Sequence, residues 1–199
     1  MSELLPVFLK LEGRSVLLVG GGRLAKAKLP ALRAAGARVR VVAPGIAPEI
    51  EASGAAIARR GFEPADLDGV WLAIAAATPE VNRAVSRAAE ERRVFVNAVD
   101  DVASATAYLG GVVRKGGVVV AVSTQGRAPA LAGLLREALE AALPDDTTEW
   151  VKAAAALRAR QKASGVPFGR RRPALLEELN RLYAEAARPD SGRVGSARP

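Results

Sequence analysis

The stretch Val16-Leu17-Leu18-Val19-Gly20-Gly21-Gly22-Arg23-Leu24-Ala25 decides the fold of this chain. An apolar run ends at three glycines and continues into residues that favour a helix. Gly20, Gly22 and Ala25 follow the G-x-G-x-x-G/A spacing, in which one glycine makes a tight turn and the next lets backbone approach a pyrophosphate. A helix starting here directs free N–H groups at the phosphates. The stretch predicts a dinucleotide-binding strand, turn and helix; the alternative is an ordinary glycine-rich turn.

Composition narrows the chemistry that the chain can perform. Its 199 residues suffice for one sizeable domain, or a large and a small one, and they include no cysteine and no histidine. Disulfides and thiolate metal sites are thereby excluded, and proton transfer falls to carboxylates, hydroxyls or lysines. No apolar run approaches the roughly 18 residues of a membrane span, and residues 1–15 lack the pattern of a signal peptide. We therefore expect a cytoplasmic protein without a membrane partner.

The net charge of +8 indicates an anionic partner. Nucleic-acid-binding modules usually cluster Lys and Arg with interleaved aromatic residues. Here much of the excess lies in Arg158 to Arg172 and in the tail, whereas the aromatic residues are scattered. A small polyanionic substrate explains the charge equally well, and we expect no nucleic-acid partner.

Strand-like and helical patterns alternate over the first hundred residues. Strands are expected at 16–19, 38–43, 56–60, 70–76 and 94–99, with helices at 23–35 and 79–92. Pro30 should end or kink the first helix, and Thr78 is a candidate N-cap for the second. The alternation predicts an α/β fold of the Rossmann type, with a doubly wound, mostly parallel sheet.

The ends of two strands carry candidate site residues, because ligands bind outside the carboxyl ends of strands in open α/β sheets. The second strand ends at Ala43-Pro44-Gly45, with neither the acid that many NAD-binding units carry there nor the arginine of NADP-binding ones. The last predicted strand delivers Asp100 and Asp101. In a chain without histidine, a carboxylate at this edge is a candidate for a general base. The alternative for either aspartate is a turn cap.

The pattern changes after residue 107. Two apolar runs at 108–113 and 117–122 leave no room for a crossover helix, so they should pair as a hairpin turning at 114–116 or exchange with a partner chain. A polar turn at 123–129 precedes a helix at 130–142, whose apolar face carries Leu131, Leu134, Leu135 and Leu139. Helices are expected at 148–163 and 173–187, and the tail 188–199 is expected to be disordered.

Six segments in order make the chain similar to a known family. They are L-P-V-F-L-K-L at 5–11, V-L-L-V-G-G-G at 16–22, V-V-A-P at 41–44, V-N-R-A-V at 81–85, F-V-N-A-V-D-D at 95–101 and A-V-S-T-Q-G-R-A-P-A-L-A at 121–132. The chain resembles the precorrin-2 dehydrogenases, a family that includes the dehydrogenase/ferrochelatase part of siroheme synthase. The resemblance covers about residues 4–145, and no methyltransferase region follows, as expected for the stand-alone form.

The resemblance implies NAD-dependent oxidation of precorrin-2 to sirohydrochlorin and, in some members, insertion of ferrous iron as a further substrate. It also implies a homodimer. By this resemblance we expect a Rossmann domain at 1–112, a small β/α dimerisation segment at 113–146 and a C-terminal helical piece at 147–187, with the tail at 188–199.

The resemblance also implies roles for single residues. The family's glycine loop maps onto Gly20, Gly21, Gly22, Arg23 and Leu24, and its second-strand contact maps onto Ala43, Pro44 and Gly45. Its important aspartate maps onto Asp100, which, in a chain without histidine or cysteine, is the strongest candidate for the base that the implied oxidation needs. Where members often have Thr-Asp-Asp, this chain has Ala76-Ala77-Thr78, so we expect fewer polar contacts there and keep Thr78 as a cofactor contact. If iron is inserted, Asp100 would handle it almost alone.

The family's substrate is a polycarboxylate, and the candidate residues for it are polar or basic. They are Arg114, Lys115, Ser123, Thr124, Gly126 and Arg127. Each basic residue could equally be a solvated surface charge, and the two hydroxyls could cap the 130–142 helix. Two other functions stay open: an NAD-sensing regulatory module without chemistry, and a nucleic-acid-binding protein that uses residues 158–172.

Overall fold

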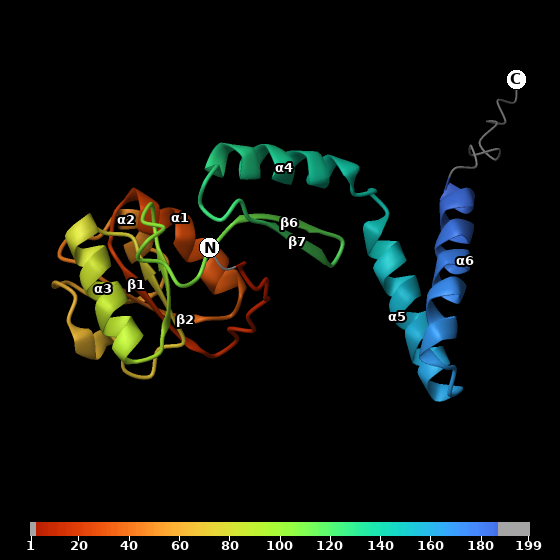
Figure 1. Cartoon of the computed structure of the whole chain (residues 1–199), viewed down its shortest axis with the longest axis horizontal. Helices are drawn as coiled ribbons and strands as arrows, with labels where there is room; N and C mark the ends of the chain where they lie inside the picture. Colours follow the sequence, from red (N-terminus) through yellow and green to blue (C-terminus); the bar gives the residue numbers. More distant parts are fainter. Residues whose placement is uncertain (1–2, 187–199) are drawn as a thin grey trace, which may run out of the picture. The chain divides into compact units, whose positions relative to one another are not determined.

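The computed structural model describes residues 3–186. Within them the chain forms two compact units (Figure 1). The first unit contains the residues up to Gly110 together with Ser123–Pro129, and the second contains Gly111–Val122 and the residues from Ala130 onward. The predicted disordered tail, 188–199, lies outside the described residues. None of the helices in the described part is both long and apolar enough to cross a membrane.

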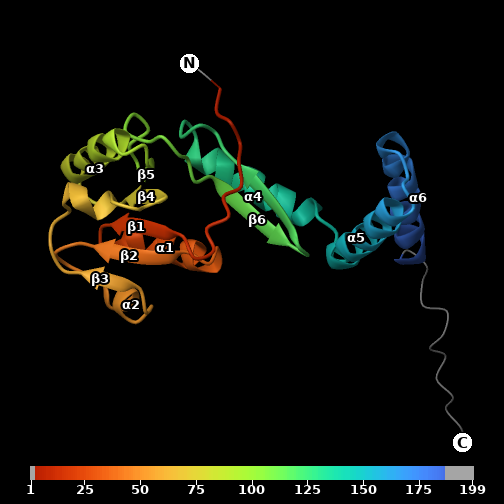
Figure 2. The ribbon, with the colours of Figure 1, turned by 90° about the horizontal axis from the view of Figure 1, so that it is seen from below.

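The first unit is built on a parallel sheet, as the alternating pattern predicts. Its strands are β1 (Ser15–Val19), β2 (Arg38–Val42), β3 (Ala56–Ala58), β4 (Leu72–Ala75) and β5 (Phe95–Ala98), in the order β3-β2-β1-β4-β5 (Figure 2). Val19 is in register with Val42 and Ala75, so these strands end at one edge. The order reverses between β1 and β4, and this switch point is where open α/β sheets bind ligands.

Helices cover both faces of the sheet. The helices α1 (Arg23–Ala34) and α2 (Pro48–Glu51) pack against Val16, Leu18 and their neighbours on one face. The helix α3 (Pro79–Glu91) and the 3-10 helix η1 (Pro64–Leu67) pack against Leu17, Val19 and theirs on the other. Because successive strand residues point to opposite faces, the continuous apolar run of β1 supplies both cores.

Of the two effects expected of Pro30, ending the helix is ruled out, because α1 continues to Ala34 with Pro30 inside it. A proline in a helix interior costs about 3 kcal/mol. Leu29 and Leu32, on either side of it in sequence, are buried in the core. Full burial of a leucine contributes about 1.5–3 kcal/mol, so the two together offset the proline.

The second unit opens with a hairpin of β6 (Gly111–Lys115) and β7 (Val118–Val122). The predicted hairpin is confirmed, but its turn lies at Gly116-Gly117 rather than at 114–116. Both glycines have positive φ, 56° and 85°. A two-residue hairpin loop of type I′ needs positive φ at both positions, which is why the glycine pair determines the turn.

Three helices complete the second unit: α4 (Pro129–Ala142), α5 (Thr147–Ala163) and α6 (Phe168–Ala186). Trp150 of α5 meets Tyr183 of α6 edge to face, with ring centroids 6.3 Å apart. The predicted start of the last helix at residue 173 is wrong, because α6 begins at Phe168 and includes Pro173. The first turn forms upstream of the proline, where the Arg170 N–H donates to the Pro167 carbonyl at 3.0 Å.

An ion pair joins the buried Asp66 of η1 to Arg60, which follows β3 in the first unit. The Asp66 carboxylate is 1% exposed and accepts hydrogen bonds from the Arg60 guanidinium at 2.8 and 2.7 Å. These bonds hold the pKa of Asp66 below its ordinary value against the opposing effect of burial. A carboxyl with a lowered folded-state pKa stabilises the fold above its unfolded pKa, and this stability is lost as the pH falls through the folded pKa.

Asp66→Asn is therefore expected to lower the free energy of unfolding at pH 7 by about 1.5–3 kcal/mol, the range for hydrogen bonds to a charged group. Urea unfolding at pH 7 and below pH 4 measures this, and the deficit should shrink in acid. The control is Asp68→Asn, because Asp68 forms an exposed pair with Arg92 at 3.0 Å and should change stability by less than about 1 kcal/mol. An equal loss in the two variants would contradict the assignment.

Candidate active site

The glycine loop after β1 is wedged between the ends of two neighbouring strands. Gly20 has φ +121°, and a Cβ there would lie 2.2 Å from the Ala76 carbonyl oxygen. A Cβ on Gly21 would lie 2.0 Å from the Gly45 carbonyl oxygen, and the Gly21 carbonyl accepts the Ala47 N–H at 2.8 Å. Backbone contact on both sides therefore requires glycine at 20 and 21, and it fixes the course of the loop.

Gly22 differs from its two neighbours because a Cβ built on it meets no protein atom within 4 Å. It is the N-cap of α1, and the Lys26 N–H donates to its carbonyl at 2.9 Å. The N–H groups of the preceding first turn, Arg23 to Ala25, therefore lie outside the helical ladder. No acidic residue stands in that turn. Open space beside Gly22 and a positive helix end fit the pyrophosphate of a dinucleotide.

The residues after β2 lie beside this loop, as the predicted cofactor contact requires. Ala43 is buried and donates its N–H to the Ala58 carbonyl at 3.2 Å, whereas Pro44 and Gly45 are exposed. The close approach of Gly45 to Gly21 joins the two predicted cofactor segments. Of the remaining loop candidates, Arg23 is exposed and Leu24 packs partly against the core.

The end of β4 forms the other side of the switch point. The Ala76 N–H donates to the Val19 carbonyl at 2.8 Å, which extends the pairing of β1 and β4 to the sheet edge. Thr78 is the N-cap residue of α3, as predicted, and is exposed at this edge. The pKa of Glu80 is lowered, first by a hydrogen bond from its own backbone N–H and next by the Thr78 hydroxyl.

Asn82 is a residue of this edge that the sequence reasoning did not single out. It lies in α3 with 3% of its surface exposed. Its Oδ1 accepts the Ala77 N–H at 3.0 Å, and its Nδ2 donates to the Val99 carbonyl at a longer 3.5 Å. An amide on the core-facing side of an amphipathic helix is the signal that could have identified it, because buried polar groups need partners.

The two aspartates after β5 have different surroundings. The Asp101 carboxylate accepts the Ser104 N–H at 3.2 Å, and hydrogen bonding to Ser104, with a smaller contribution from the charge of Arg83, lowers its pKa. Asp101 thus caps the turn that follows. Asp100 is exposed and has a left-handed backbone, with φ +60°. This conformation is uncommon outside glycine but is enriched in Asp and Asn.

The 123–129 segment belongs to the same unit as these aspartates. Gly126 has φ +74°, and a Cβ there would lie 2.5 Å from the Val102 side chain, so this loop rests on the turn after Asp101. The Ser123 hydroxyl accepts the Gln125 N–H at 3.1 Å, and the Thr124 hydroxyl accepts the Ala128 N–H at 3.3 Å. The hydroxyls stabilise the loop, which brings four substrate candidates near Asp100: Ser123, Thr124, Gly126 and Arg127.

The other two basic candidates lie in the second unit. Arg114 is exposed on β6. The Lys115 ammonium donates to the Leu143 carbonyl at 2.6 Å and to the Asp145 carboxylate at 2.8 Å. This pairing caps the end of α4, where a cation is also favoured by the helix dipole. Lys115 therefore has a structural role in its own unit.

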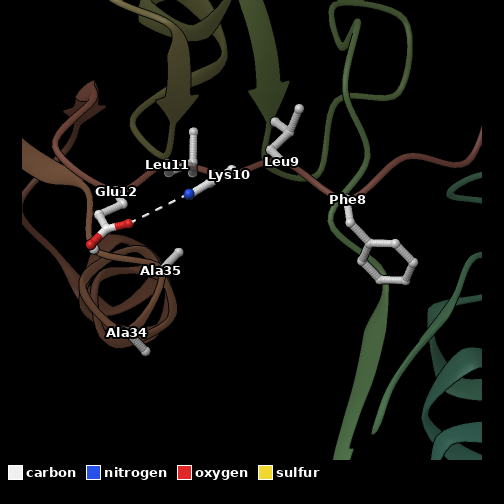
Figure 3. Close-up of a pocket in the computed structure, with 8 residues that line it drawn as sticks. Phe8, Leu9, Lys10, Leu11, Glu12, Ala34 and Ala35 are labelled. Carbon is white, nitrogen blue, oxygen red and sulfur yellow. Dashed lines mark ion pairs between the residues drawn. The ribbon is translucent and has the colours of Figure 1, made fainter. Parts of the chain in front are cut away.

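A hollow of about 520 Å³ lies in the first unit but away from the glycine loop (Figure 3). Residues 8–12 and residues 34–36, at the end of α1, line it, and Lys10 pairs with Glu12 at 3.8 Å. The glycine loop stands at the opposite end of α1, which is 12 residues long and so spans about 18 Å. The hollow is thus separate from the switch point. Within residues 3–186 no group of three metal-ligating side chains converges.

Comparison with known proteins places this geometry in a family. Residues 7–111 match a family model described as "Putative NAD(P)-binding". Siroheme synthase 1 of Aeromonas salmonicida (strain A449) is 41% identical over 179 residues, which cover 85% of this chain and 37% of that protein. The siroheme synthase of Citrobacter koseri is 41% identical over 173 residues, 84% of this chain and 38% of that protein. The chain thus spans about two fifths of the length of these curated relatives.

A solved structure extends the likeness to the fold. SirC, a precorrin-2 dehydrogenase, superimposes with a TM-score of 0.69 at 27% identity, covering 87% of this chain and 88% of the SirC chain. The matched segment holds the glycine loop, the strand ends beside it and Asp100. The chain therefore belongs to the family described as putative NAD(P)-binding, and it is similar to siroheme synthases and to a precorrin-2 dehydrogenase.

Proposed function

We propose that this protein catalyses the NAD-dependent oxidation of precorrin-2 to sirohydrochlorin, a step of siroheme biosynthesis. The observation that carries the proposal is the switch point itself. Its glycine loop leaves room beside Gly22 and at the start of α1, and Asp100 stands at the same sheet edge. The likeness to SirC supports this choice of substrate.

The chemistry divides between the cofactor and one side chain. Oxidation removes a hydride and a proton from precorrin-2, and NAD when bound supplies the hydride acceptor. The Gly20–Gly22 loop and the first turn of α1 would hold the pyrophosphate of NAD, and Ala43, Pro44 and Gly45 would supply the further contact to the cofactor beside that loop. The Asp100 carboxylate takes the proton, so that sirohydrochlorin, NADH and one proton balance the reaction.

The net positive charge of the chain suits a substrate that carries several carboxylates. Arg127 is an exposed cation on the loop that rests against the turn after Asp101. Its guanidinium donates a hydrogen bond to the Gln125 side-chain oxygen, which orients it. We assign substrate carboxylate binding to Arg127, with Ser123, Thr124 and Gly126 shaping the loop. Arg114 stays a candidate from the second unit, and Lys115 a weaker one because it caps α4.

Insertion of ferrous iron into sirohydrochlorin would be a second activity, with iron as its own substrate. If ferrous iron is a substrate, Asp100 is the residue of this edge that would meet it, because carboxylate oxygen is an acceptable ligand for ferrous iron in a chain without histidine or cysteine. Adding ferrous iron after the oxidation is complete separates the two activities by their spectra.

We also propose a homodimer formed through the segment 113–146. The α4 leucines Leu131, Leu134, Leu135 and Leu139 are all exposed in the single chain. An exposed apolar stripe of this kind is typical of an interface. The boundaries 1–112 and 147–187 for the Rossmann domain and the helical piece accompany this proposal.

Leu134→Glu is expected to turn the dimer into a monomer, because a charge would replace a side chain that is 64% exposed in one chain and buried in the dimer. Sedimentation velocity at micromolar concentration measures the change. Leu176→Glu on α6 is the matched control, since Leu176 is 52% exposed, and it should leave the dimer intact. A Leu134→Glu protein that sediments like the wild type would refute the α4 interface.

The function is tested by anaerobic turnover. NADH formation at steady state is followed with precorrin-2 and NAD, with each omitted in turn and with NADP replacing NAD. We expect NADH only when both are present and a lower rate with NADP. A folded protein that binds NAD yet forms no NADH would favour an NAD-sensing regulatory module instead.

A further inference from the structure

The buried amide of Asn82 connects the two sides of the proposed site. Its Oδ1 receives the Ala77 N–H, which lies in the loop after β4. Its Nδ2 donates to the carbonyl of Val99, the residue directly before Asp100. The Val99 N–H in turn donates to the Ala75 carbonyl at 2.9 Å. Both backbone groups of Val99 are therefore hydrogen-bonded, the carbonyl to Asn82 of α3 and the N–H to Ala75 at the end of β4.

The position is an unusual one for an amide. Val85, Ala88 and Ala89 bury the same side of α3 against the sheet. An amide buried without partners costs about 1–3 kcal/mol on the protein scale, so an apolar residue would suit helix packing better. The two partners that Asn82 does have are both backbone groups of the carboxyl edge, which indicates that its role concerns that edge.

The turn that follows needs a restraint of this kind. Asp100 has φ +60°, and a left-handed residue other than glycine costs about 1–2 kcal/mol. Such a conformation persists when the surrounding structure determines it. The Val99 carbonyl, held by Asn82, and the Asp101 carboxylate, which accepts the Ser104 N–H, fix the backbone on the two sides of Asp100.

We propose that Asn82 is a positioning residue of the active site. Its side-chain amide holds the loop after β4, at Ala77, and the turn at Asp100, through Val99, in fixed positions relative to each other. This inference rests on the proposed function for its kinetic consequence. Its structural consequence, the restraint of the 99–101 backbone, is independent of the substrate.

Two substitutions separate the two bonds. Asn82→Asp keeps an oxygen for the Ala77 N–H but loses the donor to Val99, so NAD affinity should change less than about threefold. Its kcat should fall about 10–100-fold, because small displacements of a catalytic group have effects of that size. Asn82→Ala loses both bonds, so its kcat should fall as far and its Kd for NAD should rise about fivefold or more.

Ser86→Ala is the matched control on the same helix. The Ser86 hydroxyl donates to the Asn82 backbone carbonyl at 3.0 Å, one turn further along α3. Its removal perturbs the helix without touching Ala77 or Val99. Wild-type kcat and Kd are expected, which would separate a positioning effect from a general loosening of α3.

The test combines anaerobic kinetics, NAD titration and amide hydrogen exchange of residues 97–104. We expect a lower kcat with nearly unchanged Kd for Asn82→Asp, and faster exchange at 99–101 in both Asn82 variants but not in Ser86→Ala. Wild-type kcat in Asn82→Asp, or wild-type exchange at 99–101 in Asn82→Ala, would overturn the inference. A wild-type protein without turnover would sink the proposed function instead, and the exchange data would still decide the role of Asn82.

Discussion

Asp100→Ala is expected to reduce sirohydrochlorin formation at least about 100-fold, the lower end of what general bases contribute. Asp100 is exposed at the same sheet edge as the glycine loop, with the end of β4 between them, and the chain has no histidine or cysteine to replace it. NAD affinity should stay within about threefold of the wild type, because the glycine loop is untouched. Single-turnover absorbance under anaerobic conditions gives the rate, and an NAD titration gives the affinity.

The neighbouring aspartate supplies the control. Asp101→Asn keeps an oxygen for the Ser104 N–H, which the Asp101 carboxylate accepts at 3.2 Å, and should retain turnover within about threefold. Equal rates in Asp100→Ala and the wild type would remove Asp100 from the mechanism while leaving the enzyme assignment in place. Equal loss in the two variants would instead indicate that the turn as a whole matters.

The glycine loop gives the second large effect, with opposite outcomes at two positions. Gly20→Ala places a methyl group 2.2 Å from the Ala76 carbonyl oxygen at a φ of +121°. The free energy of unfolding should therefore fall by about 3 kcal/mol or more. Gly22→Ala adds its methyl group where no protein atom lies within 4 Å, at a φ of −95° that alanine tolerates.

Gly22→Ala should therefore keep the free energy of unfolding within about 1 kcal/mol of the wild type, since only an N-cap preference is lost. Its Kd for NAD should rise about tenfold or more, because the methyl group occupies the space proposed for the phosphates. Urea unfolding and NAD titration measure the two quantities. An unchanged Kd in a folded Gly22→Ala protein would move the cofactor away from this loop.

The arrangement of the sheet could be predicted from sequence because two local signals agree. The apolar run at Val16–Val19 has no polar side, as expected for a strand covered on both faces, and the glycines that follow it end the strand. Strand and helix patterns then alternate, which leaves few topologies other than a doubly wound sheet.

The differences arise where tertiary packing or backbone geometry outweighs a local rule. An interior proline such as Pro30 can end or kink a helix, but α1 continues past it, with Leu29 and Leu32 buried on both sides of it. The sequence predicts the hairpin turn at 114–116, yet the left-handed residues are Gly116 and Gly117. Turn position follows which residues can adopt positive φ, rather than which are polar.

Site residues were predictable only as far as strand ends reveal them. Asp100 and Asp101 are adjacent in sequence and indistinguishable by pattern, whereas the structure gives Asp101 the Ser104 N–H and leaves Asp100 exposed. The position of Gly126 against Val102 depends on a contact between loops 24 residues apart. Asn82 connects three elements through backbone groups, which no spacing in one sequence encodes.

The measurement that tests the account most directly is the stoichiometry of the wild-type reaction. Purified protein, precorrin-2 and NAD are mixed without oxygen or iron, and the spectra of sirohydrochlorin and NADH are followed together. We expect both to grow in equal amounts until precorrin-2 is exhausted, because each oxidation transfers one hydride. Sirohydrochlorin without NADH, or neither product from a folded protein that binds NAD, would contradict it.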